Sequence, residues 1–564
     1  MAEHNSATVG GYLAARLAHI GIKDYFAVPG DYNLVLLDEF LGNDNLRMIS
    51  CCNELNAGYA ADGYARATGG AGAVVVTFTV GGLSLINAIG GAYAEDLPVI
   101  AISGGPNTNS EAEYELLHHT FGKVDYGYQR EMYRSVTAEA VIIQHPEEAP
   151  RQIDHAIATA LRVRKPVYLE VACNIASART SSPNLQSFEL DPKSDESSLS
   201  AAVAHATELL AKAIKPVLVA GVKLRPSRAE APFLALANAS GYAVAGMPNA
   251  KGMFPEQHPS YMGVYWGPVG SPGCGEIVES ADLGIFVGAT FTDYTTTGHA
   301  SLVNPDKMIQ VHPNCVFVAG QSYNDVTMQH FLSALANTIE RNDASLVAFS
   351  RVAEQRRVPV RGLDDAVLTT RQLFARIQGV IDGESAVIAE TGDSWFNGMA
   401  LELPEGSRFE IQMQYGSIGW SVGATLGYCA GAPNRRVIAL IGDGSFQVTA
   451  QEVSTMIRYG LRPIIFLINN GGYTIEVEIH DGPYNAIQNW DYAELVNVFN
   501  GPDGNGWSCR VATEGELDTA IAKAVKHDGL ALIEVMIDRD DCSKDLLAWG
   551  AHVARNNGRP PRHR

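Results

Sequence analysis

Two short polar turns near the carboxyl end of the sequence carry residue types that bind metals and phosphates. Residues 442–444 are Gly-Asp-Gly, residues 469–472 are Asn-Asn-Gly-Gly, and each turn follows an apolar run. Residues 445–468 between them are about as long as one right-handed βαβ crossover. Both turns should therefore lie at the carboxyl edge of one parallel sheet, which is where open α/β sheets bind ligands.

The two turns offer oxygen atoms that suit Mg²⁺. Asp443 and Asn470 provide two side-chain oxygens, and the carbonyl of Gly472 could provide a third, which leaves positions for phosphate oxygens and water. A helix is predicted over residues 445–459. The backbone N–H groups at its start can bind a diphosphate, and they belong to Gly444, Ser445 and Phe446.

Glycine-rich turns of this kind also occur without a bound ligand. A lone Gly-Asp-Gly is more often a tight turn with an Asx cap, but the spacing to Asn469-Asn470 favours a ligand site here. The dinucleotide fingerprint Gly-x-Gly-x-x-Gly and the P-loop pattern are absent at this turn. A second glycine cluster, residues 267–275, has no apolar strand before it, so we predict a plain loop there.

The elements that must position these residues follow one repeated pattern. Short β-branched runs that end in Gly, Asp or Asn alternate with Ala-rich amphipathic stretches, which predicts an α/β fold of three doubly wound domains with mainly parallel sheets. Periodicity stops at two predicted linkers, residues 177–200 and 341–362. The predicted domains are residues 1–180, 200–340 and 362–564.

Composition excludes several classes of protein. The chain has 564 residues and a net charge of −21, which argues against nucleic acid or an anionic membrane surface as partner. Eight scattered cysteines without a C-x-x-C pair predict neither a zinc site nor a disulfide framework. We expect no secretion signal and no membrane span, and therefore a cytoplasmic enzyme.

The two turns resemble the thiamin-diphosphate-binding motif, in which Gly-Asp-Gly is followed some two dozen residues later by Asn-Asn. The resemblance extends nearly end to end, to bacterial members of the pyruvate decarboxylase family. Six segments carry it: 28–34 (VPGDYNL), 52–66 (CNELNAGYAADGYAR), 118–119 (HH), 389–397 (AETGDSWFN), 416–420 (GSIGW) and 470–476 (NGGYTIE).

The family implies thiamin diphosphate and Mg²⁺ as cofactors, with Asp443, Asn470 and Gly472 as metal ligands. It implies an amino-terminal pyrimidine domain, a middle domain without catalytic residues and a carboxyl-terminal diphosphate domain. The cofactor would lie between two subunits of a homodimer, and two dimers would form a homotetramer. The implied reaction is conversion of pyruvate to acetaldehyde and CO₂, in which the C2 carbanion adds to the keto carbon and the thiazolium accepts the electrons released with CO₂.

The resemblance also implies catalytic roles. Small residues around Glu54 suggest a dry carboxyl group, which the family places against N1′ of the aminopyrimidine; the alternative is a surface Glu paired with Arg66. We expect His118 and His119 to follow residues 111–117 on a helix, so that at most one faces the reacting centre. The proton-handling residues would be Asp31, His118, His119 and Glu476.

Further residues match positions that bind the cofactor or enclose the substrate. A large side chain at Ile418 would lie under the bend between the two cofactor rings, although most such Ile residues are simply core. The other cofactor contacts would be Thr391, Asp393, Gly416, Tyr473 and Ile475. The walls of the substrate pocket would be Trp395, Ile475, Ile479 and Tyr294, leaving room for a methyl group.

Three alternatives remain open from the sequence. A related decarboxylase could accept a broader range of 2-keto acids. A carboligating enzyme like acetohydroxyacid synthase shares the fold, but Asp31 and the His pair argue against it. A non-catalytic binding protein on the same fold would not need Glu54, Asp443 and Asn470 together.

Overall fold

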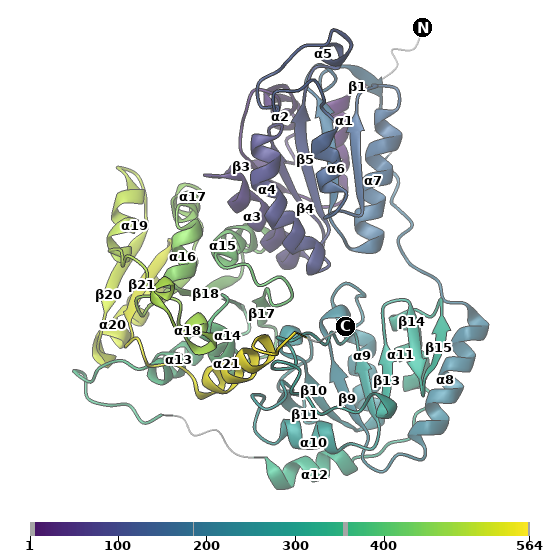
Figure 1. The fold of residues 1–564 in the computed structure, drawn as a ribbon, viewed down its shortest axis with the longest axis vertical. Helices are drawn as coiled ribbons and strands as arrows, with labels where there is room; N and C mark the ends of the chain where they lie inside the picture. Colours follow the sequence, from purple (N-terminus) through teal and green to yellow (C-terminus); the bar gives the residue numbers. More distant parts are fainter. Residues whose placement is uncertain (1–5, 184, 354–358, 562–564) are drawn as a thin grey trace.

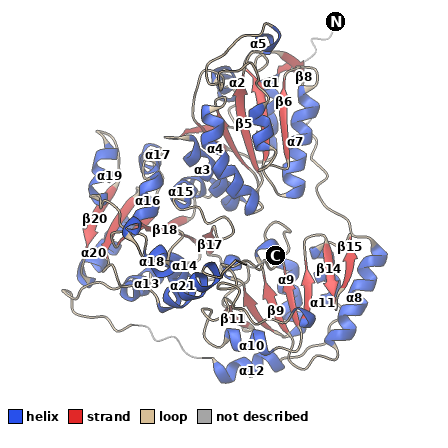
Figure 2. Cartoon of the chain, viewed as in Figure 1, coloured by secondary structure: helices blue, strands red, loops and turns tan. Residues whose placement is uncertain are grey.

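The computed structural model describes residues 6–183, 185–353 and 359–561. Three sheets, each flanked by helices, form three lobes in Figure 1: the first at the top, the middle one at the lower right and the third at the lower left. Helices cover the faces of each sheet, as Figure 2 shows. The predicted α/β class with mainly parallel sheets is confirmed.

The first sheet has six parallel strands in the order β3-β2-β4-β5-β7-β6. Its central strands are buried because they consist of Val, Ile and Ala covered on both faces. The strands are β2 (Asp24–Ala27), β3 (Arg47–Ser50), β4 (Gly72–Val76), β5 (Val99–Gly105), β6 (Glu139–Ile143) and β7 (Val167–Ala172). The helices are α1 (Val9–His19), α2 (Leu34–Leu41), α3 (Glu54–Thr68), α4 (Val80–Ala94), α5 (Thr108–Ala112), α6 (Tyr128–Tyr133) and α7 (Ala149–Val163).

The middle sheet has seven strands in the order β11-β10-β9-β12-β13-β14-β15, and β14 runs antiparallel to both of its neighbours. The strands are β9 (Val217–Ala220), β10 (Ala243–Gly246), β11 (Tyr261–Val264), β12 (Gly284–Val287), β13 (Met308–Val311), β14 (Cys315–Val318) and β15 (Gln321–Asn324). The helices are α8 (Glu196–Leu210), α9 (Glu230–Ser240), α10 (Cys274–Ser280), α11 (Met328–Ala336) and α12 (Ala344–Val352).

The third sheet has six parallel strands in the order β17-β16-β18-β19-β21-β20. The strands are β16 (Ser385–Ala389), β17 (Arg408–Ile411), β18 (Arg436–Gly442), β19 (Ile464–Asn469), β20 (Trp507–Val511) and β21 (Ala531–Met536). The helices are α13 (Thr370–Gln378), α14 (Asp393–Ala400), α15 (Trp420–Gly431), α16 (Asp443–Thr449), α17 (Glu452–Arg458), α18 (Thr474–Ile479), α19 (Tyr492–Asn500), α20 (Glu514–Lys526) and α21 (Lys544–Asn557).

Three expectations about elements need correction. The helix predicted over residues 445–459 is two helices, α16 and α17, because the chain turns at Ala450 and Gln451. The predicted linker 177–200 contains β8 (Arg179–Ser181), which pairs with β1 (Ser6–Thr8). The linker 341–362 begins with α12, while residues 354–358 lie outside the described residues. No helix among the described residues has the length and apolar character that crossing a membrane requires.

Helices α3 and α15 join the first lobe to the third through a close backbone approach. A Cβ built on Gly427 would lie 1.8 Å from the carbonyl oxygen of Ala60, and one on Gly63 would lie 2.2 Å from that of Ala424. Both glycines are therefore required for the helices to approach this closely. The chain thus holds its first and third lobes together in a fixed arrangement (Figure 1).

Gly427→Ala is expected to lower the free energy of unfolding by about 1–3 kcal/mol, because the new methyl group overlaps backbone that cannot rotate away. The gain in helix propensity, about 1 kcal/mol, offsets only part of this. The control is Gly42→Ala, at an exposed helix end with φ −71° where the nearest atom would lie 3.4 Å from the new Cβ. Thermal unfolding at a fixed protein concentration measures the effect, and equal melting temperatures for the two variants would contradict it.

Candidate active site

A cavity of about 310 Å³ lies at the carboxyl edge of the third sheet, where β16, β18 and β19 end. Because the strands are parallel, the loops that follow them converge there. Its described lining residues come from residues 370–541 alone. Of the predicted site residues, the lining includes the catalytic Glu476 and the cofactor or substrate residues Thr391, Asp393, Ile418, Asp443, Gly444, Ser445, Asn470, Gly472, Tyr473 and Ile475.

Asp443 is the first residue of α16 and is almost fully buried. Its Oδ1 accepts a hydrogen bond from the Gly444 N–H (2.7 Å), and its Oδ2 accepts one from the Gly471 N–H (2.6 Å). Burial raises the pKa of Asp443 to about 6, although these N–H groups favour the charged form. A bound cation would stabilise the charged form of this buried carboxylate.

Asn470 orients its amide toward the same turn. Its Nδ2 donates a hydrogen bond to Thr474 Oγ1 (2.6 Å), and its side-chain oxygen has no hydrogen-bond partner in the part of the chain that the structure describes. With the Asp443 carboxylate and the Gly472 carbonyl, the turn pair presents only hard oxygen atoms. This donor set fits Mg²⁺ and does not fit a soft metal.

Glycines bring the two turns into contact. A Cβ on Gly444 would lie 2.4 Å from the Tyr473 ring, and one on Gly472 would lie 2.4 Å from the carbonyl oxygen of Asn485. Gly471 has φ +78°, a conformation that larger residues rarely adopt. The backbone N–H groups at the start of α16 are thereby kept close to the cavity. Phe446 itself packs into the core against Tyr492, so only its backbone can serve a ligand.

The loop after β16 and the loop before α15 form the opposite side of the cavity. Asp393 accepts hydrogen bonds from Ser543 and Asn397, and burial raises its pKa to about 6. Gly416 has φ +65° in the loop that leads to Ile418. Glu390 is a site residue that the sequence did not predict. It is fully buried and accepts hydrogen bonds from Thr391, Gly419 and Ser421. This carboxylate ties the two loops together.

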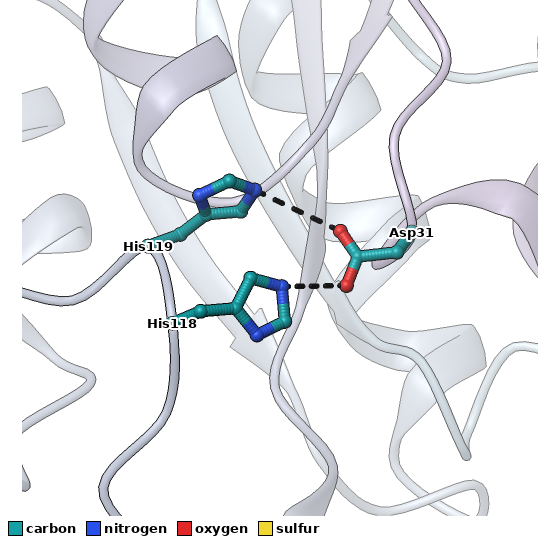
Figure 3. A group of neighbouring side chains, drawn as sticks. All are labelled: Asp31, His118 and His119. Atoms are coloured by element: carbon teal, nitrogen blue, oxygen red, sulfur yellow. Dashed lines mark hydrogen bonds and ion pairs between the residues drawn. The ribbon is translucent and has the colours of Figure 1, made fainter.

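Asp31, His118 and His119 form a cluster at the carboxyl edge of the first sheet (Figure 3). His118 Nε2 lies 2.7 Å from Asp31 Oδ2, and His119 Nε2 lies 3.8 Å from Asp31 Oδ1. The prediction that the histidines lie on a helix is wrong, since the helix α5 ends at Ala112 and His119 has φ +61°. Loop geometry lets both rings face one carboxylate, which adjacent helical side chains could not do.

Glu54 opens α3 and lies close to Gly81, where an added Cβ would come 3.3 Å from its Oε1. In the single chain the side chain is partly exposed rather than dry as expected. It does not pair with Arg66, which instead binds Asp62, Glu95 and Glu410 in a buried network.

The predicted substrate walls divide into two groups. Ile475 and the neighbouring Glu476 line the cavity on α18. Trp395, Tyr294 and Ile479 belong to the apolar cluster beneath it, where the Trp395 and Tyr294 rings meet edge to face at 6.0 Å. Burial, with the negative charges of Glu476 and Asp293, raises the pKa of Tyr294. These three therefore support the cavity in the single chain without lining it.

The predicted catalytic residues lie in two separate places in one chain. Helix α5, which follows β5 at the carboxyl edge of the first sheet, lies at the far upper end of the first lobe in Figure 1. Helix α18, which carries Glu476, lies in the third lobe. One small molecule cannot reach both groups within this chain.

Comparisons with known proteins agree with the fold and the two turns. Residues 7–128 match the family model for the "Thiamine pyrophosphate enzyme, N-terminal TPP binding domain", residues 203–339 match the central domain, and residues 384–535 match the "C-terminal TPP binding domain".

Curated relatives match over nearly the whole chain. Pyruvate decarboxylase 1 of Zea mays is 52% identical over 561 residues, which cover 98% of this chain and 92% of the relative. Pyruvate decarboxylase 3 of Arabidopsis thaliana is 52% identical over 565 residues, covering 99% and 95%. Pyruvate decarboxylase 4 of Arabidopsis thaliana is 51% identical over 563 residues, covering 99% and 93%. The chain belongs to the pyruvate decarboxylase family of thiamine pyrophosphate enzymes.

Proposed function

We propose that this chain catalyses the non-oxidative decarboxylation of pyruvate to acetaldehyde and CO₂, with thiamin diphosphate and Mg²⁺ as cofactors. The observation that carries the proposal is the pair of turns around Asp443 and Asn470, which meet at one cavity and present hard oxygens beside helix N–H groups. Relatives about 52% identical that are named pyruvate decarboxylase support the choice of substrate.

We assign the cofactor contacts as follows. Asp443, Asn470 and the Gly472 carbonyl would hold Mg²⁺, and the first N–H groups of α16 would hold the diphosphate. Ile418 lines the cavity where a bulky side chain can fix the angle between the two rings of the cofactor. When bound, thiamin diphosphate supplies a nucleophilic carbon that adds to the keto group and accepts the electrons released with CO₂.

We assign proton transfers to the first lobe and to Glu476. Glu54 would donate a hydrogen bond to N1′ of the aminopyrimidine. In the cluster of Asp31, His118 and His119, the proton shared between His118 Nε2 and Asp31 Oδ2 is available at a 2.7 Å hydrogen bond. A carboxylate in contact with two imidazoles can pass a proton through these hydrogen bonds to the product carbon.

We infer a homodimer in which the first lobe of one subunit meets the third lobe of the other, and a dimer of dimers as the assembly. The separation of the two groups of catalytic residues supports this, as does the partial exposure of Glu54. We also propose that the three domains of each subunit are residues 1–180, 200–340 and 362–564. Eight free cysteines support a reducing, cytoplasmic location.

The test is a coupled assay. Purified protein with pyruvate, Mg²⁺ and thiamin diphosphate should oxidise NADH in the presence of alcohol dehydrogenase, which reduces acetaldehyde. Formation of acetolactate instead would identify a carboligating enzyme. Higher kcat/KM for longer 2-keto acids than for pyruvate would identify a decarboxylase of broader range. CO₂ release that does not depend on the cofactor would contradict the proposal.

Trp395→Ala is expected to raise kcat/KM for branched or aromatic 2-keto acids relative to pyruvate by about tenfold or more, since each accommodated methylene is worth about 1–3 kcal/mol. The ring is fully buried, so the free energy of unfolding should also fall by about 3–5 kcal/mol.

Phe374→Ala is the control for Trp395→Ala, because it opens a cavity in the same apolar cluster but on α13. Phe374→Ala should lower the free energy of unfolding and leave the ratio of kcat/KM values for the two substrates unchanged. Steady-state kinetics of both folded variants on pyruvate and a branched 2-keto acid measure the effect. If both variants shift the ratio equally, Trp395 does not shape the substrate site.

A further inference from the structure

A second and larger cleft, of about 960 Å³, lies between the first and third lobes. It is lined by the amino ends of strands from both sheets, including β2, β3, β16 and β18, and by the carboxyl ends of α3 and α15. The proposed active site uses the carboxyl edges of these sheets, so the cleft lies at the opposite edge of both. Its volume is sufficient for a small metabolite.

Cationic side chains converge on this cleft in a protein with a net charge of −21. Its lining includes two acidic residues, Asp24 and Asp382. The cationic residues of the lining are Lys23, Arg47, Arg435, Arg436 and Arg462. The lining of the cleft therefore carries a net positive charge, although the molecule as a whole is acidic. A local concentration of positive charge of this kind is typical of a site that attracts anions.

Internal contacts use only part of this positive charge. Arg47 pairs with Asp24 at 2.6 Å, and Arg435 donates hydrogen bonds to backbone carbonyls. Arg436 donates from its terminal nitrogens to the carbonyls of Ala524 and His527. These contacts hold the guanidinium groups of Arg47, Arg435 and Arg436 in place at the cleft.

Three cationic groups remain for a ligand. Arg436 Nε is buried and has no hydrogen-bond partner among the described residues. Burial and the nearby positive charge of Arg462 lower the pKa of Arg436. Arg462 pairs with the exposed Asp528 at 3.1 Å, and the structure gives the exposed Lys23 side chain no hydrogen bond or ion pair with any described residue. An anion between these side chains would offset their positive charges.

We propose that this cleft binds a phosphate-bearing small molecule, whose phosphate is held by Lys23, Arg436 and Arg462. A phosphate group offers three terminal oxygens to three cationic side chains, whereas a carboxylate offers two, and guanidinium groups bind phosphate oxygens in a two-pronged geometry. Tyr459, which also lines the cleft, offers an apolar wall for the organic part. Because the cleft joins the two lobes that α3 and α15 hold together, its ligand binds the folded chain and not the unfolded one, and so stabilises it.

The probe is ADP, titrated by calorimetry into protein preloaded with Mg²⁺ and thiamin diphosphate so that the diphosphate site is filled. We expect saturable binding at one site per chain, competition by inorganic phosphate, no binding of adenosine, and weaker binding as KCl is raised. ADP should also raise the melting temperature. Absence of saturable binding, or equal binding of adenosine, would overturn the proposal.

The test variant is Lys23→Glu with Arg462→Glu, both at exposed positions. It should bind ADP at least about tenfold more weakly, since a hydrogen bond to a charged group is worth about a tenfold change or more. The matched control, Lys212→Glu with Lys307→Glu, makes the same change in net charge at exposed positions of the middle lobe and should bind ADP as the parent does. Equal losses in both variants would show a general charge effect and refute the site. Pyruvate turnover without ADP should be unchanged in both, which separates this test from that of the proposed function.

Discussion

Glu54→Gln is expected to lower kcat for pyruvate by about 10²- to 10⁴-fold, the usual cost of losing general acid–base assistance. Glutamine fills the same space at the start of α3 but cannot share a carboxylic proton with N1′ of the aminopyrimidine. Cofactor affinity should change little, because the diphosphate and metal contacts all lie in the third lobe. The lesion should therefore appear in kcat rather than in cofactor binding.

Deuterium exchange at C2 of the bound cofactor measures the Glu54→Gln effect directly, by NMR after acid quench. Exchange should slow in the variant by a factor similar to the loss in kcat. The control is Glu208→Gln on α8, which removes an exposed ion pair with Lys212 and should leave exchange unchanged. Normal exchange in the Glu54 variant would remove Glu54 from the proposed role.

The diphosphate half of the site could be predicted because its information is local in the sequence. Gly442, Asp443 and Gly444 follow one buried strand, and Asn470 follows the next, so the parallel topology alone brings them to one edge. The strands could be predicted for the same reason, because β-branched runs that are covered on both faces have few alternative structures.

Features that depend on tertiary contacts could not be predicted. The break between α16 and α17 has no Pro or Gly to signal it. It lets Glu452 accept hydrogen bonds from Cys52 and Asn56 of the first lobe. The paired orientation of His118 and His119 depends on a positive φ at His119 and on stacking of His118 against Tyr32. Periodicity carries no signal for either.

The roles of buried carboxylates far from the Gly-Asp-Gly and Asn-Asn turns could not be predicted from the sequence either. Glu390 organises the loops around Thr391 and Gly419, but its role exists only because residues 419–421 fold back onto the end of β16. Ser543, which binds Asp393, is 150 positions away in the sequence. The sequence around Ser543 indicates only the start of a helix, where serine is a common residue.

Mixing Glu54→Gln protomers with Asp443→Ala protomers is expected to restore activity that neither variant has alone. Glu54 lies in the first lobe and Asp443 in the third, and the described residues of the Asp443 cavity include none from the first lobe. If each site joins the first lobe of one subunit to the third lobe of the other, a heterodimer contains one site with both lesions and one with neither. Random exchange of equal amounts should then recover about a quarter of the parent activity, because half of the dimers are mixed and half of their sites are intact.

The experiment requires verified exchange of subunits, since a dimer of this kind can be stable only as a dimer. Coexpression with two different affinity tags and sequential purification isolates the heterodimer, and native mass spectrometry confirms its composition. The control is a heterodimer in which one protomer carries both substitutions and the other carries neither. This control should be active only if each site is built within a single chain. Under the intersubunit arrangement each of its sites retains one lesion, so it should be inactive while the mixed heterodimer is active. The reverse pattern would show that each chain builds its own site, and that the two groups of catalytic residues move together within one subunit.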